Sequence, residues 1–129
     1  MNSGLQNKKF GFKRFLASFK NSFNGLKYAY LNEQSLFIHA LATILTVILG
    51  CLLKISLTEW LTIMTLLVMT AILELLNTAI ESVCDAVTLE KSERIKISKD
   101  TASAAVFLSS LASLIVGLLI FVPKIIALF

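Results

Sequence analysis

The sequence predicts an all-α membrane protein in which three membrane-spanning helices follow an amphipathic helix on the membrane surface. Hydrophobic residues make up 57% of the 129 residues and charged residues only 16%, too apolar for an ordinary soluble domain. The apolar residues gather in three spans, each near the roughly 20 residues that a helix needs to cross a bilayer core. Basic residues flank these spans, so an anionic membrane leaflet is a better partner than nucleic acid for the net charge of +4.

Segment 1–34 is expected to form a helix that lies on the cytoplasmic surface of the membrane. At about 100° per residue, one arc of this helix carries seven apolar side chains: Phe12, Phe15, Leu16, Phe19, Phe23, Leu26 and Tyr30. Lys13, Lys20 and Lys27 recur along one flank of the arc, where their stems can cover apolar surface and their ammonium groups can reach lipid headgroups. Arg14 lies on the opposite side. Packing on a soluble partner is the alternative, and the aromatic residues and lysines favour the membrane.

The three membrane helices are expected at 35–54, 58–85 and 103–123, within one integral-membrane domain. A short outer turn joins the first two, and a cytoplasmic loop over 86–102 joins the last two. An open sheet or a lone strand could not satisfy its backbone groups inside the bilayer, so each span is read as a helix. Pro123 follows the third apolar span and is expected to end or kink its helix.

The distribution of lysine and arginine indicates the orientation. Six of these residues precede the first span, one lies in the first connection, four lie in the second connection and one follows the third span. The cytoplasmic loops of membrane proteins carry an excess of positive charge. We therefore expect a multi-pass protein whose N-terminus and second connection lie in the cytoplasm.

A polar stripe runs along the second membrane helix. Glu74, Asn77, Glu81 and Asp85 stand at i, i+3, i+7 and i+11, so the three carboxylates share one side of the helix. An interhelical hydrogen-bond network would account for the asparagine but poorly for three acids, because a carboxylate at membrane depth is costly and rarely faces lipid. No basic residue occurs in any span to pair with them. A hard cation such as Mg²⁺ would relieve the repulsion.

Further polar residues are expected to meet this stripe at the cytoplasmic face. Glu33 comes just before the first span, and Lys99 and Asp100 come just before the third. Together with Glu81, these residues would lie at one membrane depth. The acids could bind a metal ion, and the lysine could bind phosphate. Glu74 would lie slightly deeper, as a carboxylate suited to act as a base. This arrangement indicates phosphoryl transfer to a substrate that lies in the membrane.

Several motifs together resemble the prokaryotic diacylglycerol kinase family: "NE" at 32–33, "ELLNTAIE" at 74–81 followed by Asp85, and "KD" at 99–100 followed by "SAAV". The resemblance extends from Phe12 to Lys124. It implies a small membrane kinase of the bacterial cytoplasmic membrane, assembled as a homotrimer with active sites at contacts between subunits. It also implies Mg²⁺ with ATP as the phosphoryl donor and a membrane lipid alcohol as the acceptor.

The same resemblance implies a role for each site residue. Glu74 matches the catalytic base, and Glu33 and Glu81 match the residues that hold Mg²⁺. Asn77 orients the site and Asp85 supports it. The nucleotide is expected to contact six residues: Arg14, Glu33, Glu81, Glu90, Lys99 and Asp100.

The resemblance also bears on the lipid. "TEW" at 58–60 and "GLLIFVPK" at 117–124 are similar to the Gram-positive branch of the family, which implies undecaprenol as the acceptor. Diacylglycerol, which would give phosphatidic acid, is the alternative. His39 stands where the enteric members are expected to carry an acid, and we interpret it as a hydrogen-bonded interfacial histidine.

Other classes of function are less well supported by the pattern. A subunit of a cation-coupled transporter would line acids along a path toward both membrane faces, whereas these acids crowd the cytoplasmic half. A membrane-bound structural module would explain the surface helix but not the acids. For Arg14 and Glu90, a solvated surface charge is the alternative interpretation.

Overall fold

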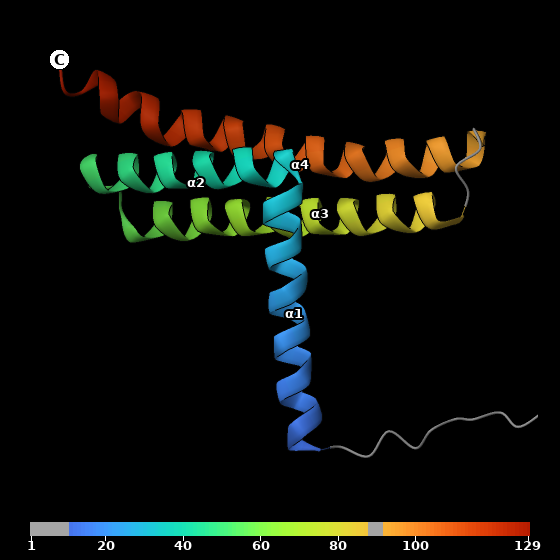
Figure 1. The fold of residues 1–129 in the computed structure, drawn as a ribbon. Helices are drawn as coiled ribbons and strands as arrows, with labels where there is room; N and C mark the ends of the chain where they lie inside the picture. Colours follow the sequence, from blue (N-terminus) through green and yellow to red (C-terminus); the bar gives the residue numbers. More distant parts are fainter. Residues whose placement is uncertain (1–10, 88–91) are drawn as a thin grey trace, which may run out of the picture.

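The computed structural model describes residues 11–87 and 92–129, and this part of the chain is helical throughout except for short connections. It contains four helices: α1 (Phe12–Asn32), α2 (Gln34–Leu52), α3 (Leu57–Val87) and α4 (Glu93–Ile126). The last three lie side by side, and α1 projects away from them at a steep angle from the start of α2 (Figure 1). These three are also long and apolar enough to cross a membrane. The predicted all-α class with three long apolar helices is confirmed.

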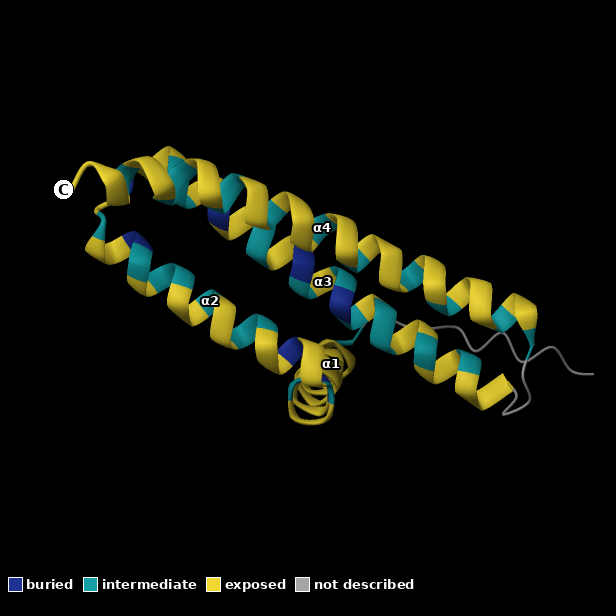
Figure 2. Ribbon diagram, turned by 90° about the horizontal axis from the view of Figure 1, so that it is seen from above, coloured by how far each residue is buried: buried dark blue, intermediate teal, exposed yellow. Residues whose placement is uncertain are grey.

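Helix α3 is the element on which the other two long helices pack. Its contact with α4 is the most extensive in the molecule, and its contact with α2 is smaller. The buried residues of α3 are Ile63, Thr70 and Glu74, which stand at i, i+7 and i+11 and therefore share one face. Most large apolar side chains of the long helices are exposed (Figure 2). Apolar surface on this scale marks faces that lipid or further protein covers.

The connection between α3 and α4 is shorter than the loop predicted over 86–102. Helix α3 continues to Val87 and α4 begins at Glu93, so Lys99 and Asp100 stand on a helix and not in a loop. The prediction placed the ends of the helices near the ends of the apolar spans. Charge alone does not prevent helix formation, and residues 93–100 include good helix formers and neither glycine nor proline.

Helix α1 meets the other helices at its C-terminal end. Glu33 follows it with an extended backbone (φ −102°, ψ 116°), and α2 begins at the next residue. Ala29 is the buried residue of α1. Helix α1 contacts both α2 and α3. Phe12 and Phe23 are among its exposed apolar residues. The predicted placement of this helix on a membrane surface stays a prediction, and residues 1–10 of the predicted segment lie outside the described residues.

Polar contacts stabilise the start of α3 and join it to the end of α4, at the end of the bundle away from α1. Ser56 and Glu59 form a capping box: the Ser56 N–H donates to Glu59 Oε2 at 2.6 Å, and the Glu59 N–H donates to Ser56 Oγ at 3.3 Å. Lys124 Nζ lies 3.2 Å from Glu59 Oε2 and ties α4 to the start of α3. Helix α4 passes through Pro123, where the sequence predicts an end or a bend, and it ends at Ile126. A proline inside a helix removes one N–H donor and crowds the carbonyl four residues earlier, and this one lies about a turn from the end of α4.

Close approach of α2 and α3 at this end depends on Gly50. A Cβ atom built there would lie 2.7 Å from Trp60 Cη2 and 2.8 Å from Trp60 Cζ2. By contrast, nothing lies within 4 Å of a Cβ atom built at Gly117 in α4. Gly50 is therefore a contact point where an added methyl group has no space.

We expect Gly50→Ala to lower the thermal unfolding temperature in detergent, because the Trp60 ring must move to admit the methyl group. Overpacking of this kind costs about 1–3 kcal/mol. Gly117→Ala is the control, and it should keep or raise the unfolding temperature because alanine is the better helix former. Equal losses in the two variants would contradict the steric explanation.

Candidate active site

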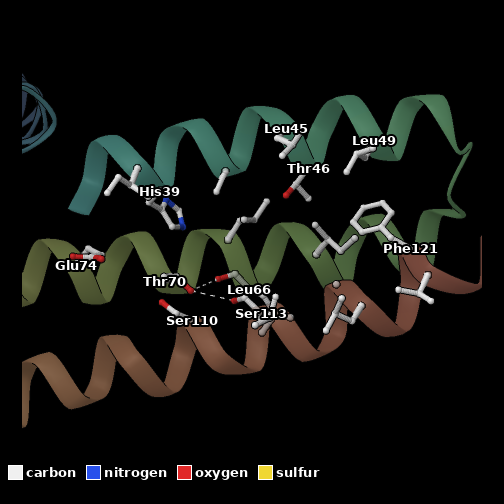
Figure 3. Close-up of a pocket in the computed structure, with 18 of the residues that line it drawn as sticks. His39, Leu45, Thr46, Leu49, Leu66, Thr70, Glu74, Ser110, Ser113 and Phe121 are labelled. Carbon is white, nitrogen blue, oxygen red and sulfur yellow. Dashed lines mark hydrogen bonds between the residues drawn. The ribbon is translucent and has the colours of Figure 1, made fainter. Parts of the chain in front are cut away.

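A cavity of about 540 Å³ lies between α2, α3 and α4 (Figure 3). This volume falls in the range of roughly 300–1,000 Å³ that is usual for ligand sites. Apolar side chains such as Leu49 and Phe121 line one end, and polar side chains such as His39, Thr70 and Glu74 lie toward the other end. The cavity can therefore accept an apolar chain that carries one polar group.

Glu74 projects from α3 and lines the polar end of this cavity. Its residue is only 8% exposed, as expected for an acid inside an apolar span. The described residues place no cation beside it, because their two ion pairs join Lys99 to Asp85 and Lys124 to Glu59. A buried carboxylate without a cation needs a proton or a ligand that donates a hydrogen bond.

The remaining members of the polar stripe have polar partners. Asn77 Nδ2 donates to Glu81 Oε1 at 2.9 Å, one turn along α3. Lys99 Nζ on α4 donates to Asp85 Oδ1 at 2.6 Å. The lysine–aspartate pair is solvent-accessible, so it is a weak interaction that a phosphate group could replace. The structure therefore brings two of the predicted site residues on α3 together and joins α3 to α4 through two others.

Within the described residues, no side-chain hydrogen bond or ion pair joins the other predicted site residues to this group. Glu33 precedes α2 at the junction with α1, and its side chain makes no capping hydrogen bond. Arg14 is exposed near the start of α1, and Asp100 is exposed on α4. Glu90 lies outside the described residues. Among the residues that are described, no group of three or more His, Cys, Asp and Glu side chains could hold a metal ion.

Three hydroxyl groups join α3 to α4 one turn from Glu74. Thr70 is 3% exposed, and its Oγ1 lies 2.7 Å from Ser109 Oγ and 3.3 Å from Ser113 Oγ. Ser110 and Ser113 also line the cavity. The sequence carries a signal for this cluster, because serines recur at 109, 110 and 113 inside an otherwise apolar span. Charged residues alone did not reveal it.

His39 projects from α2 toward α3 and lines the same end of the cavity as Glu74 (Figure 3). Both of its ring nitrogens are buried, and neither has a hydrogen-bond partner in the described part of the chain. The expected hydrogen bond of His39 is therefore absent from the described part of the chain, and the interfacial placement stays a prediction. The physical reason is the direction of the ring, which points from α2 into the space beside α3, where its nitrogens are buried (Figure 3).

Comparison with known proteins places the chain in context. The sequence model described as prokaryotic diacylglycerol kinase matches residues 20–121. An undecaprenol kinase of Bacillus subtilis (strain 168) is 39% identical over 111 residues, which cover 86% of this chain and 90% of that protein. A diacylglycerol kinase of Synechocystis is 34% identical over 115 residues, with 88% and 65% covered. The diacylglycerol kinase of Escherichia coli (strain K12) is 30% identical over 111 residues, with 86% and 91% covered.

The hydroxyl cluster yields a stability prediction. Thr70→Val removes the contacts to Ser109 and Ser113 with little change in shape, and we expect a loss of roughly 0.5–1.5 kcal/mol in unfolding free energy. Thr65→Val is the matched control, because the Thr65 hydroxyl donates only to the Leu61 carbonyl of its own helix. Reversible unfolding in mixed micelles measures both. Similar losses in the two variants would show that the interhelical contact contributes nothing.

Proposed function

The chain belongs to the prokaryotic diacylglycerol kinase family and is a membrane lipid kinase, and we propose that it transfers the γ-phosphate of ATP to the hydroxyl of undecaprenol. One observation carries the proposal: the buried Glu74 carboxylate lines a largely apolar cavity, and none of the described residues places a cation beside it. The higher identity to an undecaprenol kinase than to the two diacylglycerol kinases described above supports the choice of lipid.

Glu74 is the base in this proposal. The lipid alcohol enters the cavity so that its hydroxyl reaches the carboxylate and its hydrocarbon chain lies along the apolar wall. The hydroxyl proton passes to Glu74 as the alcohol oxygen forms a bond to the γ-phosphorus and the bond to the ADP oxygen breaks. A carboxylate with no cation beside it is available to accept that proton.

The nucleotide approaches from the end of the stripe that lies beyond the cavity. Glu81 is suited to bind a metal ion because the amide of Asn77 holds one of its carboxylate oxygens. Glu33 is suited to the same role because its side chain makes no helix-capping hydrogen bond. These two acids would hold Mg²⁺, which would offset the negative charge on the phosphates of ATP. Lys99 can turn from Asp85 to a phosphate group. Three further contacts to the nucleotide are proposed for Arg14, Glu90 and Asp100.

We also propose a homotrimer in the bacterial cytoplasmic membrane, with the N-terminus and the α3–α4 connection in the cytoplasm. The scattered positions of the acids in one chain support an assembly, because a neighbouring copy could supply the groups that a single chain does not bring together. The exposed apolar faces of the long helices supply surface for it. The excess of basic residues at the N-terminus and around the second connection supports this orientation.

The primary test is lipid-dependent ATP turnover by the purified protein in mixed micelles, with undecaprenol and diacylglycerol offered in parallel. We expect undecaprenol to be the better substrate. Glu74→Gln should lose turnover by at least about a hundredfold while ATP binding survives, because the variant keeps the shape but cannot accept a proton.

Glu93→Gln, at an exposed position at the start of α4, is the matched control and should keep full turnover. Higher turnover on diacylglycerol would reassign the substrate. Near-wild-type turnover by Glu74→Gln would show that another group is the base.

A second test concerns the metal. Glu81→Ala should raise the Mg²⁺ concentration needed for half-maximal turnover, because one of two protein ligands is lost. A Mg²⁺ titration at saturating ATP and lipid measures this, with Glu93→Ala as the control. An unchanged titration curve would remove Glu81 from the metal site.

A further inference from the structure

We propose that His39 binds the hydroxyl of the lipid alcohol and holds its oxygen in place beside Glu74. The inference rests on the proposed function, since it concerns the acceptor of the same reaction. It assigns a polar contact with the substrate to α2, a helix that otherwise supplies mainly apolar side chains to the wall of the cavity.

The first argument is that the imidazole has no partner. Both ring nitrogens of His39 are buried, and no hydrogen bond reaches either one within the described residues. A neutral imidazole presents one donor and one acceptor, and buried polar groups in native proteins are nearly always paired. A ligand hydroxyl in the cavity is a group that would pair it.

The second argument is position. His39 on α2 and Glu74 on α3 both line the cavity and lie at its polar end (Figure 3). The Thr70 hydroxyl is already engaged: Thr70 Oγ1 contacts Ser113 Oγ and also donates to the Leu66 carbonyl at 3.0 Å. The imidazole of His39 and the carboxylate of Glu74 are the two ionisable groups that line the cavity, and together they can bind one hydroxyl group.

The third argument is chemical fit. An alcohol has one proton to donate and two lone pairs. Its proton goes to Glu74, one lone pair accepts the N–H of His39, and the other attacks the γ-phosphorus. His39 transfers no proton in this step, and its N–H fixes the direction of the attacking lone pair. Misplacement of a reacting atom by about 1 Å can cost roughly a hundredfold in rate.

The test compares His39→Leu and His39→Gln with wild type in mixed micelles, using undecaprenol, Mg²⁺ and ATP. For His39→Leu we expect kcat/KM for the lipid to fall roughly tenfold to a hundredfold, with the KM for ATP unchanged. The unfolding temperature should stay equal or rise, because leucine leaves no buried polar atom without a hydrogen-bond partner at this position. His39→Gln, which keeps an N–H donor, should recover part of the lost activity.

Thr43→Val is the control variant on the same helix. The Thr43 hydroxyl donates to the carbonyl of His39 at 2.8 Å, yet the residue does not line the cavity. Its lipid and ATP kinetics should match those of wild type.

Each other outcome overturns the inference. Wild-type lipid kinetics in His39→Leu would show that the imidazole does not contact the acceptor. A lower unfolding temperature or a failure to fold would assign His39 to a structural contact, including one with a neighbouring copy. Failure of the proposed function is seen separately, as absent lipid-dependent turnover in wild type or as full turnover in Glu74→Gln.

Discussion

The cost of placing a carboxylate among apolar helices is the constraint on which the rest of the structure depends. Glu74 sits in a span that is long and apolar enough to cross a bilayer, where a charge without a partner is strongly disfavoured. In this fold the Glu74 side chain lines a cavity between the helices and does not lie on their outer faces. A group that is costly for stability is thereby placed where a substrate hydroxyl can satisfy it.

The cavity forms because α2 and α4 both pack on α3. The buried residues of α3 lie on one face of this helix. The Thr70 hydroxyl cluster joins α4 to α3. The absence of a side chain at Gly50 lets α2 approach Trp60 near the start of α3. The walls are thus fixed by small and polar residues, while large apolar side chains remain free for lipid or for other copies.

Much of the fold could be predicted because the bilayer imposes simple rules. Apolar length marked the three long helices, and the spacing of the acids placed Glu74 inside a span. The start of α4 was misjudged because the helix was assumed to begin where the apolar span begins, although good helix formers extend it into the charged segment before the span. The environment of His39 was also misjudged, since the direction of a side chain at a helix start depends on which helix it packs against.

The sequence by itself determined the helical class, the lipid kinase family and the identity of the candidate acids, because hydrophobic length and motif spacing are local properties of the chain. The tertiary structure decided that His39 and Glu74 share one cavity, that Lys99 pairs with Asp85, and that hydroxyl groups join α3 to α4 beside the acid. These relations join residues that lie 14 or more positions apart in the chain. Their distances follow from helix packing, which periodicity within a single segment does not specify.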